Sequence, residues 1–257
     1  FCYKRFEPEH RFYLQLKHCI SIIILNQEIK LKAVDKMFKT ETHLHVSEIS
    51  PCSKINASEM VALYHEAGYK TIFVSDHFKQ IYFDALGDIA WQDKVTIFLS
   101  GYYRAKAAAK KFGMNVLMSA ELLFEGNPNH YLVYGITKEF LDSYPDLCKL
   151  SVEEFYKIAK KHNVFVVQAH PFRDGNCFPT PNSVDAFEVY NANQRHKDFS
   201  EKSEESAIQN GLYMTAGSDT HRLEDVAKGG VLTVTEIKSA EDYISLVKSG
   251  KIELFRG

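Results

Sequence analysis

The residues in this sequence that could do chemistry are histidines and carboxylates placed in short groups. His43 and His45 are two residues apart, and Asp219 and His221 have the same spacing. Imidazole nitrogens together with carboxylate oxygens suit zinc, manganese or iron, and one tetrahedral ion takes about four ligands. A set of eight such side chains therefore predicts a centre of two or three divalent ions. The eight are His43, His45, His77, Glu121, His130, His170, Asp219 and His221.

Alternating strand and helix patterns predict the elements that must position these residues. Short apolar runs predict strands at 71–75, 115–119, 164–167, 186–190, 212–215 and 231–234, after a first strand that begins near residue 38. Helical patterns occur at 57–67, 102–112, 151–162, 199–210 and 239–249. Ser151 and Glu154 have the spacing of a capping box. Buried strands that alternate with helices predict an α/β fold with a largely parallel sheet, open or closed as a barrel.

Seven of the eight metal-type side chains fall at the C-terminal ends of these strands, and His130, at a strand start, is the exception. Residues two apart in a strand share a face, so His43 and His45 can reach one ion. In βα folds the C-terminal strand ends form the active-site face. One histidine at a strand end is more often a hydrogen-bonded loop residue than a ligand. The whole set at one edge favours a metal site instead.

The remaining histidines carry less weight. His65 and His162 lie in predicted helices, where we expect them on the surface. His10 and His18 lie in the first 36 residues and give no functional signal. His196 follows a predicted strand end, so it is open to two interpretations, contact with substrate or the start of the next helix.

Composition excludes several classes of protein. Lys and Arg number 31 and Asp and Glu 33, a formal net charge of −2, so a long nucleic acid is not expected as a partner. No apolar run approaches the roughly 20 residues of a membrane-spanning helix, so no membrane partner is expected. The five cysteines are scattered and form no C-x-x-C pair, which predicts reduced thiols and a cytoplasmic location.

The length of 257 residues suits one large α/β domain or two small ones. Residues 1–36 contain none of the 13 glycines of the chain and show no clear periodicity. We therefore expect an N-terminal extension over residues 1–36, outside the working domain. That domain is expected to cover residues 37–257.

The order of the motifs resembles the PHP family, named for polymerase and histidinol phosphatase. The motifs that carry the resemblance are His43-Leu44-His45, Asp76-His77, His170-Pro171 and Gly217-Ser218-Asp219-Thr220-His221, with Glu121 and His130 similar to further metal ligands of the family. The resemblance runs from about Met37 to His221. It implies a distorted (β/α)7 barrel of the PHP type, with a trinuclear metal centre at the C-terminal strand ends that cleaves phosphoesters.

The resemblance also implies how the ligands divide among the ions. The sets are His43, His45, Glu121 and Asp219 for one ion, the bridging Glu121 with His130 and His170 for a second, and His77 and His221 for a third. Many members complete the third ion with a His or Asp shortly after the H-x-H pair. Here Glu48 is the only carboxylate in that stretch, so it is a further candidate metal ligand.

Two neighbouring divalent ions lower the pKa of a bridging water. This predicts hydrolysis of a phosphomonoester or a terminal phosphodiester, with a metal-bridging hydroxide as the nucleophile. The residues expected to be catalytic are His43, Glu121, Asp219 and His221. Positive side chains would bind the phosphate charge, and Arg173 is the first candidate. Further candidates for substrate binding are Arg195, His196 and Arg222.

The expected substrate is a small phosphorylated compound. Histidinol phosphate, a nucleotide, the end of a short oligonucleotide and phosphotyrosine would each fit the family. Two alternatives stay open. Amidohydrolases, which cleave C–N or ester bonds on a similar barrel, also begin with an H-x-H pair at the first strand end. A PHP module can also be a non-catalytic metal-binding domain.

Overall fold

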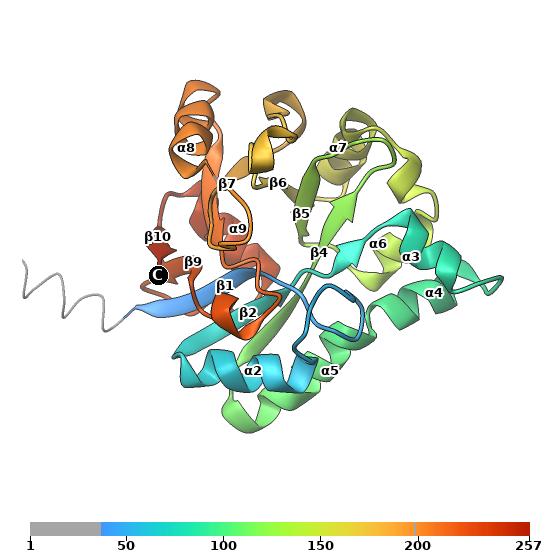
Figure 1. The fold of residues 1–257 in the computed structure, drawn as a ribbon, viewed down its shortest axis with the longest axis horizontal. Helices are drawn as coiled ribbons and strands as arrows, with labels where there is room; N and C mark the ends of the chain where they lie inside the picture. Colours follow the sequence, from blue (N-terminus) through green and yellow to red (C-terminus); the bar gives the residue numbers. More distant parts are fainter. Residues whose placement is uncertain (1–36, 198) are drawn as a thin grey trace, which may run out of the picture. The chain divides into compact units, whose positions relative to one another are not determined.

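A computed structural model of the chain describes residues 37–197 and 199–257 (Figure 1). The expected extension over residues 1–36, with His10 and His18, lies outside the described residues. Contacts unite Phe38–Gly257 into one unit. Within the described part, no helix has the length and apolar character needed to cross a membrane.

A mixed sheet of ten strands forms the centre of this unit, in the order β10-β9-β1-β2-β4-β5-β6-β7-β8, with β3 paired to β4. The strands are β1 (Phe38–Leu44), β2 (Tyr69–Val74), β3 (His77–Phe78), β4 (Asn115–Leu123), β5 (His130–Tyr134), β6 (Phe165–Ala169), β7 (Ala186–Asn191), β8 (Tyr213–Gly217), β9 (Gly229–Thr233) and β10 (Glu253–Arg256). The apolar runs of the sequence thus correspond to strands, with ends shifted by a few residues.

The helices cover the outside of the sheet. They are α2 (Ala57–Glu66), α3 (Gln80–Ala85), α4 (Trp91–Phe98), α5 (Ser100–Ala109), α6 (Lys138–Ser143), α7 (Val152–Lys161), α8 (Ser200–Gln209) and α9 (Ala240–Lys248). Figure 1 shows α2 and α5 side by side along one side of the sheet, and these two helices contact each other. Helix α7 begins with the predicted capping box, in which Ser151 and Glu154 each accept from the other's backbone N–H.

Strand direction is only partly as predicted. The pairs β1–β2, β2–β4, β3–β4, β6–β7 and β7–β8 are parallel, whereas β5, β9 and β10 run antiparallel to their neighbours. The segment after β8 joins β1 through Thr220, whose N–H donates to the His43 carbonyl at 3.3 Å and whose carbonyl accepts from His45 N–H at 3.1 Å. This contact nearly closes the sheet into a barrel.

Aromatic side chains fill the interior directly beneath the H-x-H pair. The rings of Phe73, Tyr134 and Tyr243 are fully buried, with centroids 4.8–5.1 Å apart. Tyr243 comes from α9, so this helix completes the packing of the core beneath the H-x-H pair. The Tyr134 hydroxyl donates to the carbonyl of Thr42 at 3.0 Å, one residue before His43. The core therefore supports the backbone that carries the first predicted ligands.

Candidate metal centre

The first predicted pair lies where β1 ends. His43 is in β1, and His45 follows its last residue, Leu44. Leu44 joins the apolar cluster beneath α2, so alternation along the strand turns both histidines to the opposite face. Both imidazoles are fully buried, and their Nε2 atoms lie 3.1 Å apart. Two donor nitrogens therefore face the same point.

Two carboxylates complete this first group. Glu121, in β4, has Oε1 3.4 Å from His43 Nε2 and Oε2 3.5 Å from His45 Nε2. Asp219, which follows β8, has Oδ1 3.4 Å from His43 Nε2 and 3.3 Å from His45 Nε2. Two imidazoles and two carboxylates are the type and number of donors that a divalent ion such as zinc takes.

Glu121 also faces a second group of imidazoles. Its Oε1 lies 3.0 Å from His130 Nδ1 and 3.2 Å from His170 Nε2. Its Oε2 lies 2.6 Å from His77 Nδ1. His130 belongs to this group because β5 is antiparallel, so that the start of β5 lies beside the C-terminal ends of β4 and β6. His130, the one candidate ligand at a strand start, thus reaches the centre because β5 runs antiparallel to its neighbours.

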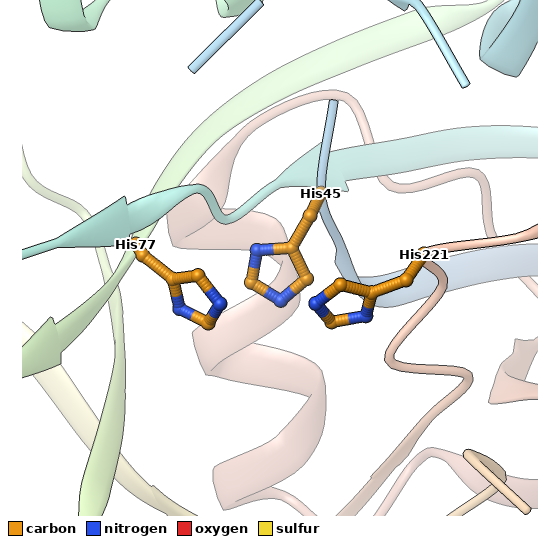
Figure 2. A group of neighbouring side chains, drawn as sticks. All are labelled: His45, His77 and His221. Carbon is orange, nitrogen blue, oxygen red and sulfur yellow. The ribbon is translucent and has the colours of Figure 1, made fainter. Parts of the chain in front are cut away.

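A third group consists of His45, His77 and His221, which Figure 2 shows with His45 between the other two rings. The ring centroid of His45 lies 4.3 Å from that of His77 and 4.4 Å from that of His221. Each of the three offers one nitrogen, and these nitrogens lie within 4.8 Å of one another. The structure therefore brings together all eight metal-type side chains of the sequence pattern.

Two of these residues have a left-handed backbone, which is uncommon for residues other than glycine. The φ angle of His170 is +33° and that of Asp219 is +51°. Such a conformation costs about 1–3 kcal/mol and persists where the surroundings enforce it, often at functional sites. Here it turns the chain sharply at the end of a strand.

The fit of these groups to an ion is supported by polar atoms that lack a hydrogen bond. Among the described residues, His45 Nδ1, His170 Nδ1 and Glu121 Oε2 are buried with no hydrogen-bond partner. His77 Nδ1 lies 2.6 Å from Glu121 Oε2, yet the pair does not have hydrogen-bond geometry. Buried polar atoms are costly when unpaired. The imidazole and carboxylate groups therefore suit divalent metal binding.

Opposite charges shift the pKa values in this cluster. Burial lowers the pKa of His43, but carboxylates led by Glu188 and Asp219 outweigh burial and raise this pKa well above its usual value. Burial and neighbouring imidazoles hold the pKa of His45 well below its usual value. Burial would raise the pKa of Asp219, yet the charges of His43 and Arg173 hold it well below its usual range. The carboxylates are thus available as anionic ligands.

Sequence analysis missed Glu188, a fully buried carboxylate in β7. Its Oε1 lies 2.8 Å from His43 Nδ1, and because a carboxylate only accepts, Nδ1 carries the hydrogen. Its Oε2 accepts from the backbone N–H of His170 at 3.2 Å and from Asn191 Nδ2 at 2.8 Å. Glu188 therefore fixes the ring of His43 so that Nε2 faces the other ligands.

A second missed carboxylate, Glu41 in β1, is also fully buried. Its Oε1 accepts from the backbone N–H groups of Thr42, His43 and Ser218 at 2.9–3.0 Å, and its Oε2 accepts from the Tyr64 hydroxyl at 2.8 Å. Burial outweighs these hydrogen bonds and raises the pKa of Glu41 to about 7. The contacts tie the end of β8 to β1, and so hold the H-x-H and D-x-H segments together.

Arg173 is the predicted substrate-binding residue that the structure places against the ligands. Its Nη2 donates to Asn191 Oδ1 at 2.9 Å and contacts Asp219 Oδ2. Its side chain is 14% exposed, so the guanidinium is largely withdrawn from water. A cation in this position lies beside the carboxylate of a candidate ligand.

The other candidates for substrate binding have partners outside the ligand cluster. Arg195 Nη1 donates to both carboxylate oxygens of Asp225, at 2.7 and 2.8 Å. His196 Nδ1 lies 2.7 Å from Asp174 Oδ2, and both side chains are about two-fifths exposed. The side chain of Arg222 is 49% exposed. Asp225 also accepts from the backbone N–H of Arg222, so Arg195 steadies the loop that carries the D-x-H motif.

Glu48 lies at the N-terminus of α2. Both of its carboxylate oxygens accept from the backbone N–H of Ala57, at 3.1 and 3.0 Å. Helix N-termini favour negative charge, so this position satisfies the carboxylate without an ion. Glu48 is not part of the three groups of convergent ligands found among the described residues.

Comparison with known proteins relates this fold to a family. Residues 198–252 match the model of a family described as PHP-associated. No curated protein matches the chain in sequence. Among solved structures, the chain is similar to a two-domain protein from Bacteroides vulgatus containing a predicted PHP-like metal-dependent phosphoesterase, with a TM-score of 0.64 and 14% identity. The match covers 86% of this chain and 65% of that one, so this chain spans less than two thirds of its length.

Two further structures share the fold. A lesion-specific endonuclease from Pyrococcus furiosus has a TM-score of 0.58 and 12% identity, over 85% of this chain and 57% of that one. An amidohydrolase from Chromobacterium violaceum, with bound sulfate and no metal, has a TM-score of 0.51 and 14% identity, over 84% of this chain and 98% of that one. The chain therefore shares a PHP-like fold with these structures, and its residues 198–252 are similar to the PHP-associated family.

Proposed function

We propose that this chain is a metal-dependent phosphoesterase with two or three zinc, manganese or iron ions in a trinuclear PHP-type centre, held on a distorted (β/α)7 barrel. The observation that carries the proposal is the position of Glu121. Its two carboxylate oxygens lie within 3.5 Å of imidazole nitrogens from His43, His45, His77, His130 and His170. A carboxylate shared in this way can bridge neighbouring ions.

The ions would be held by three sets of side chains. One set is His43, His45, Glu121 and Asp219, a second is Glu121, His130 and His170, and a third includes His77 and His221. When bound there, divalent ions supply hydroxide at neutral pH and hold the oxygens of a phosphoryl group. This makes His43, Glu121, Asp219 and His221 the proposed catalytic residues.

Arg173 would bind the phosphate. Its Nη2 is engaged by Asn191 and Asp219, whereas its Nε is buried with no hydrogen-bond partner among the described residues. A guanidinium with an unused donor beside a metal centre suits a phosphate oxygen. Arg195 would act through Asp225 on the D-x-H loop, and His196 and Arg222 would contact substrate from the more exposed side.

The substrate would be a small phosphorylated compound or the phosphorylated end of a nucleic acid. The decisive experiment is a hydrolysis screen of the purified chain with Mn²⁺, Zn²⁺ and Fe²⁺ supplied in turn. The substrates are histidinol phosphate, a nucleoside bisphosphate, a 5′-phosphorylated oligonucleotide and a phosphotyrosine peptide, with p-nitrophenyl phosphate as a general probe. We expect turnover of at least one, and its loss in His43→Ala and Asp219→Ala.

His162→Ala is the matched control, because His162 is an exposed histidine at the end of α7. It should keep full activity. Near wild-type turnover by His43→Ala or Asp219→Ala, with metal present, would contradict the assignment.

A second candidate function is hydrolysis of C–N or ester bonds, which the similarity to the Chromobacterium amidohydrolase favours. A panel of amides and lactones, run beside the phosphoester panel, separates the two. Turnover of the amide panel alone would replace the proposed function. Tight metal binding with no turnover in either panel would instead indicate a non-catalytic metal-binding module.

A further inference from the structure

We propose that Asn191 is a positioning residue for substrate binding, because it holds the guanidinium of Arg173 in the orientation that receives a phosphoryl group. The inference rests on the proposed function, which takes Arg173 as the phosphate-binding residue. Asn191 is the last residue of β7, and it is buried. Its side-chain amide makes hydrogen bonds to three residues of the candidate centre, Arg173, Glu188 and Asp219.

The chemistry of these partners fixes the orientation of the Asn191 amide. Its Oδ1 accepts from Arg173 Nη2 at 2.9 Å, and a guanidinium only donates. Its Nδ2 lies 2.8 Å from Glu188 Oε2 and 3.3 Å from Asp219 Oδ2, and ionised carboxylates only accept. Turning the amide over would set its NH2 against the cation and its oxygen against two carboxylates. Asn191 is therefore held in one orientation from both sides.

The two oxygens of Asp219 have separate surroundings, and Asn191 contributes to this division. Oδ1 faces the two Nε2 atoms of the H-x-H pair, at 3.4 and 3.3 Å. Oδ2 instead meets only donors, which are Arg173 Nη2, Asn191 Nδ2 at 3.3 Å and Asn193 Nδ2 at 3.4 Å. The donors thus occupy Oδ2 and leave Oδ1 for an ion.

Arg173 needs a second partner to keep a donor free for phosphate. Arginine readily forms two parallel hydrogen bonds with one carboxylate, so pairing with Asp219 alone would engage more of its donors. In the structure Nη2, which carries two hydrogens, meets Asn191 Oδ1 as well as Asp219 Oδ2. Nε stays buried without a hydrogen-bond partner in the described part of the chain. Asn191 therefore prevents two-point pairing and leaves Nε for a phosphate oxygen.

The test is a double-mutant cycle that measures binding of inorganic phosphate by titration calorimetry. It uses the full chain loaded with Mn²⁺ and freed of excess metal. We expect the dissociation constant for phosphate to rise roughly 10-fold in Asn191→Ala and on the order of 100-fold in Arg173→Ala, within the range for hydrogen bonds to charged groups. In the Arg173→Ala background, Asn191→Ala should change it by less than about 2-fold, because the residue acts through Arg173.

Two further variants separate positioning from a purely structural role. Asn191→Ser, whose hydroxyl is too short to reach Arg173, should weaken phosphate binding as Asn191→Ala does, and it keeps the test open if the alanine variant does not fold. Asn115→Ala is the matched control. Asn115 Nδ2 donates to Glu236 Oε1 at 2.9 Å and to the carbonyl of Ile237 at 3.1 Å, at the start of β4 and about 20 Å along the strand from Glu121. This variant should lose stability in urea and keep the phosphate affinity.

Unchanged phosphate affinity in Asn191→Ala, or losses that add up in the double variant, would overturn the inference. Phosphoester hydrolysis that persists beside either result leaves the proposed function in place. A cycle with the expected non-additive result, in a chain that hydrolyses no phosphoester, supports the inference and contradicts the proposed function. A metal-loaded chain that binds no phosphate loses both.

Discussion

Replacing Glu188 by Gln tests whether a carboxylate outside the ligand set controls metal binding. Glu188 Oε1 accepts a hydrogen bond from His43 Nδ1, with the two atoms 2.8 Å apart, and both side chains are fully buried. Gln has nearly the same shape as Glu but carries no charge and has only one accepting oxygen. The change therefore removes a charge-assisted hydrogen bond without creating a cavity.

The structure indicates the size of the effect. Glu188 accepts three hydrogen bonds, from His43, from the backbone N–H of His170 and from Asn191 Nδ2. In Glu188→Gln the amide NH2 must face a donor in either orientation, which leaves at least one donor unpaired at a cost of about 1–3 kcal/mol. Loss of an outer partner of a ligating histidine typically weakens metal binding by about 10–100-fold. We expect the dissociation constant of the tightest metal site to rise within this range, about 1.4–2.7 kcal/mol.

The assay is metal competition against a chromophoric chelator at fixed pH, with stability followed in parallel by urea unfolding. Glu205→Gln, at an exposed position of α8, is the matched control and should leave both values unchanged. A change smaller than about 3-fold in Glu188→Gln, well under the range for outer partners, would refute the reasoning. It would mean that packing alone orients His43.

Three further results are expected. In Gly217→Ala the new Cβ would lie 2.6 Å from His43 Cβ and 2.7 Å from Glu188 Oε1, so urea unfolding should show a loss of about 1–3 kcal/mol with an unchanged m value. Chelation should lower the melting temperature by roughly 5–10 °C if free metal had been near 100 times its dissociation constant, and an unchanged melting curve would contradict bound metal. The carboxylate of Glu121, with a smaller effect of Cys52, raises the pKa of His77 to about 10 against the effect of burial, and carboxylates led by Glu188 raise the pKa of His43, so both are protonated near pH 7 before an ion binds. A metal ion binds only the neutral imidazole, so metal binding should release protons, and metal affinity should rise with pH. The check is titration calorimetry in buffers of different ionisation enthalpy. Binding heats that are the same in every buffer would argue against proton release.

The strand positions and the gathering of metal-type side chains could be predicted from sequence because both follow from local patterns. Apolar runs mark buried strands, and each candidate ligand sits at a definite place relative to its run. Strand direction depends on the connections instead. The link between β4 and β5, Phe124–Asn129, is too short for a helical crossover, so the two strands form an antiparallel hairpin. This link explains why His130 reaches the centre from a strand start.

Outer contacts could not be predicted because they join residues far apart in the sequence. His43 and Glu188 are separated by 145 positions, and the N–H of Ser218 meets Glu41 across 177 positions. A signal was nevertheless present for Glu188, a carboxylate inside the largely apolar strand β7, where a charge needs a partner.

The shared position of Glu121 has a thermodynamic consequence for how the centre fills. One carboxylate, 1% exposed, lies between two groups of imidazoles, so an ion in the first group fixes a ligand that the second group also needs. The free-energy cost of ordering the Glu121 side chain then arises only once. Each ion therefore raises the affinity of the centre for the other ion by the same factor. We therefore expect cooperative loading. At substoichiometric metal the population would divide into empty and filled molecules, with few half-filled ones, and activity would follow metal concentration along a sigmoidal curve.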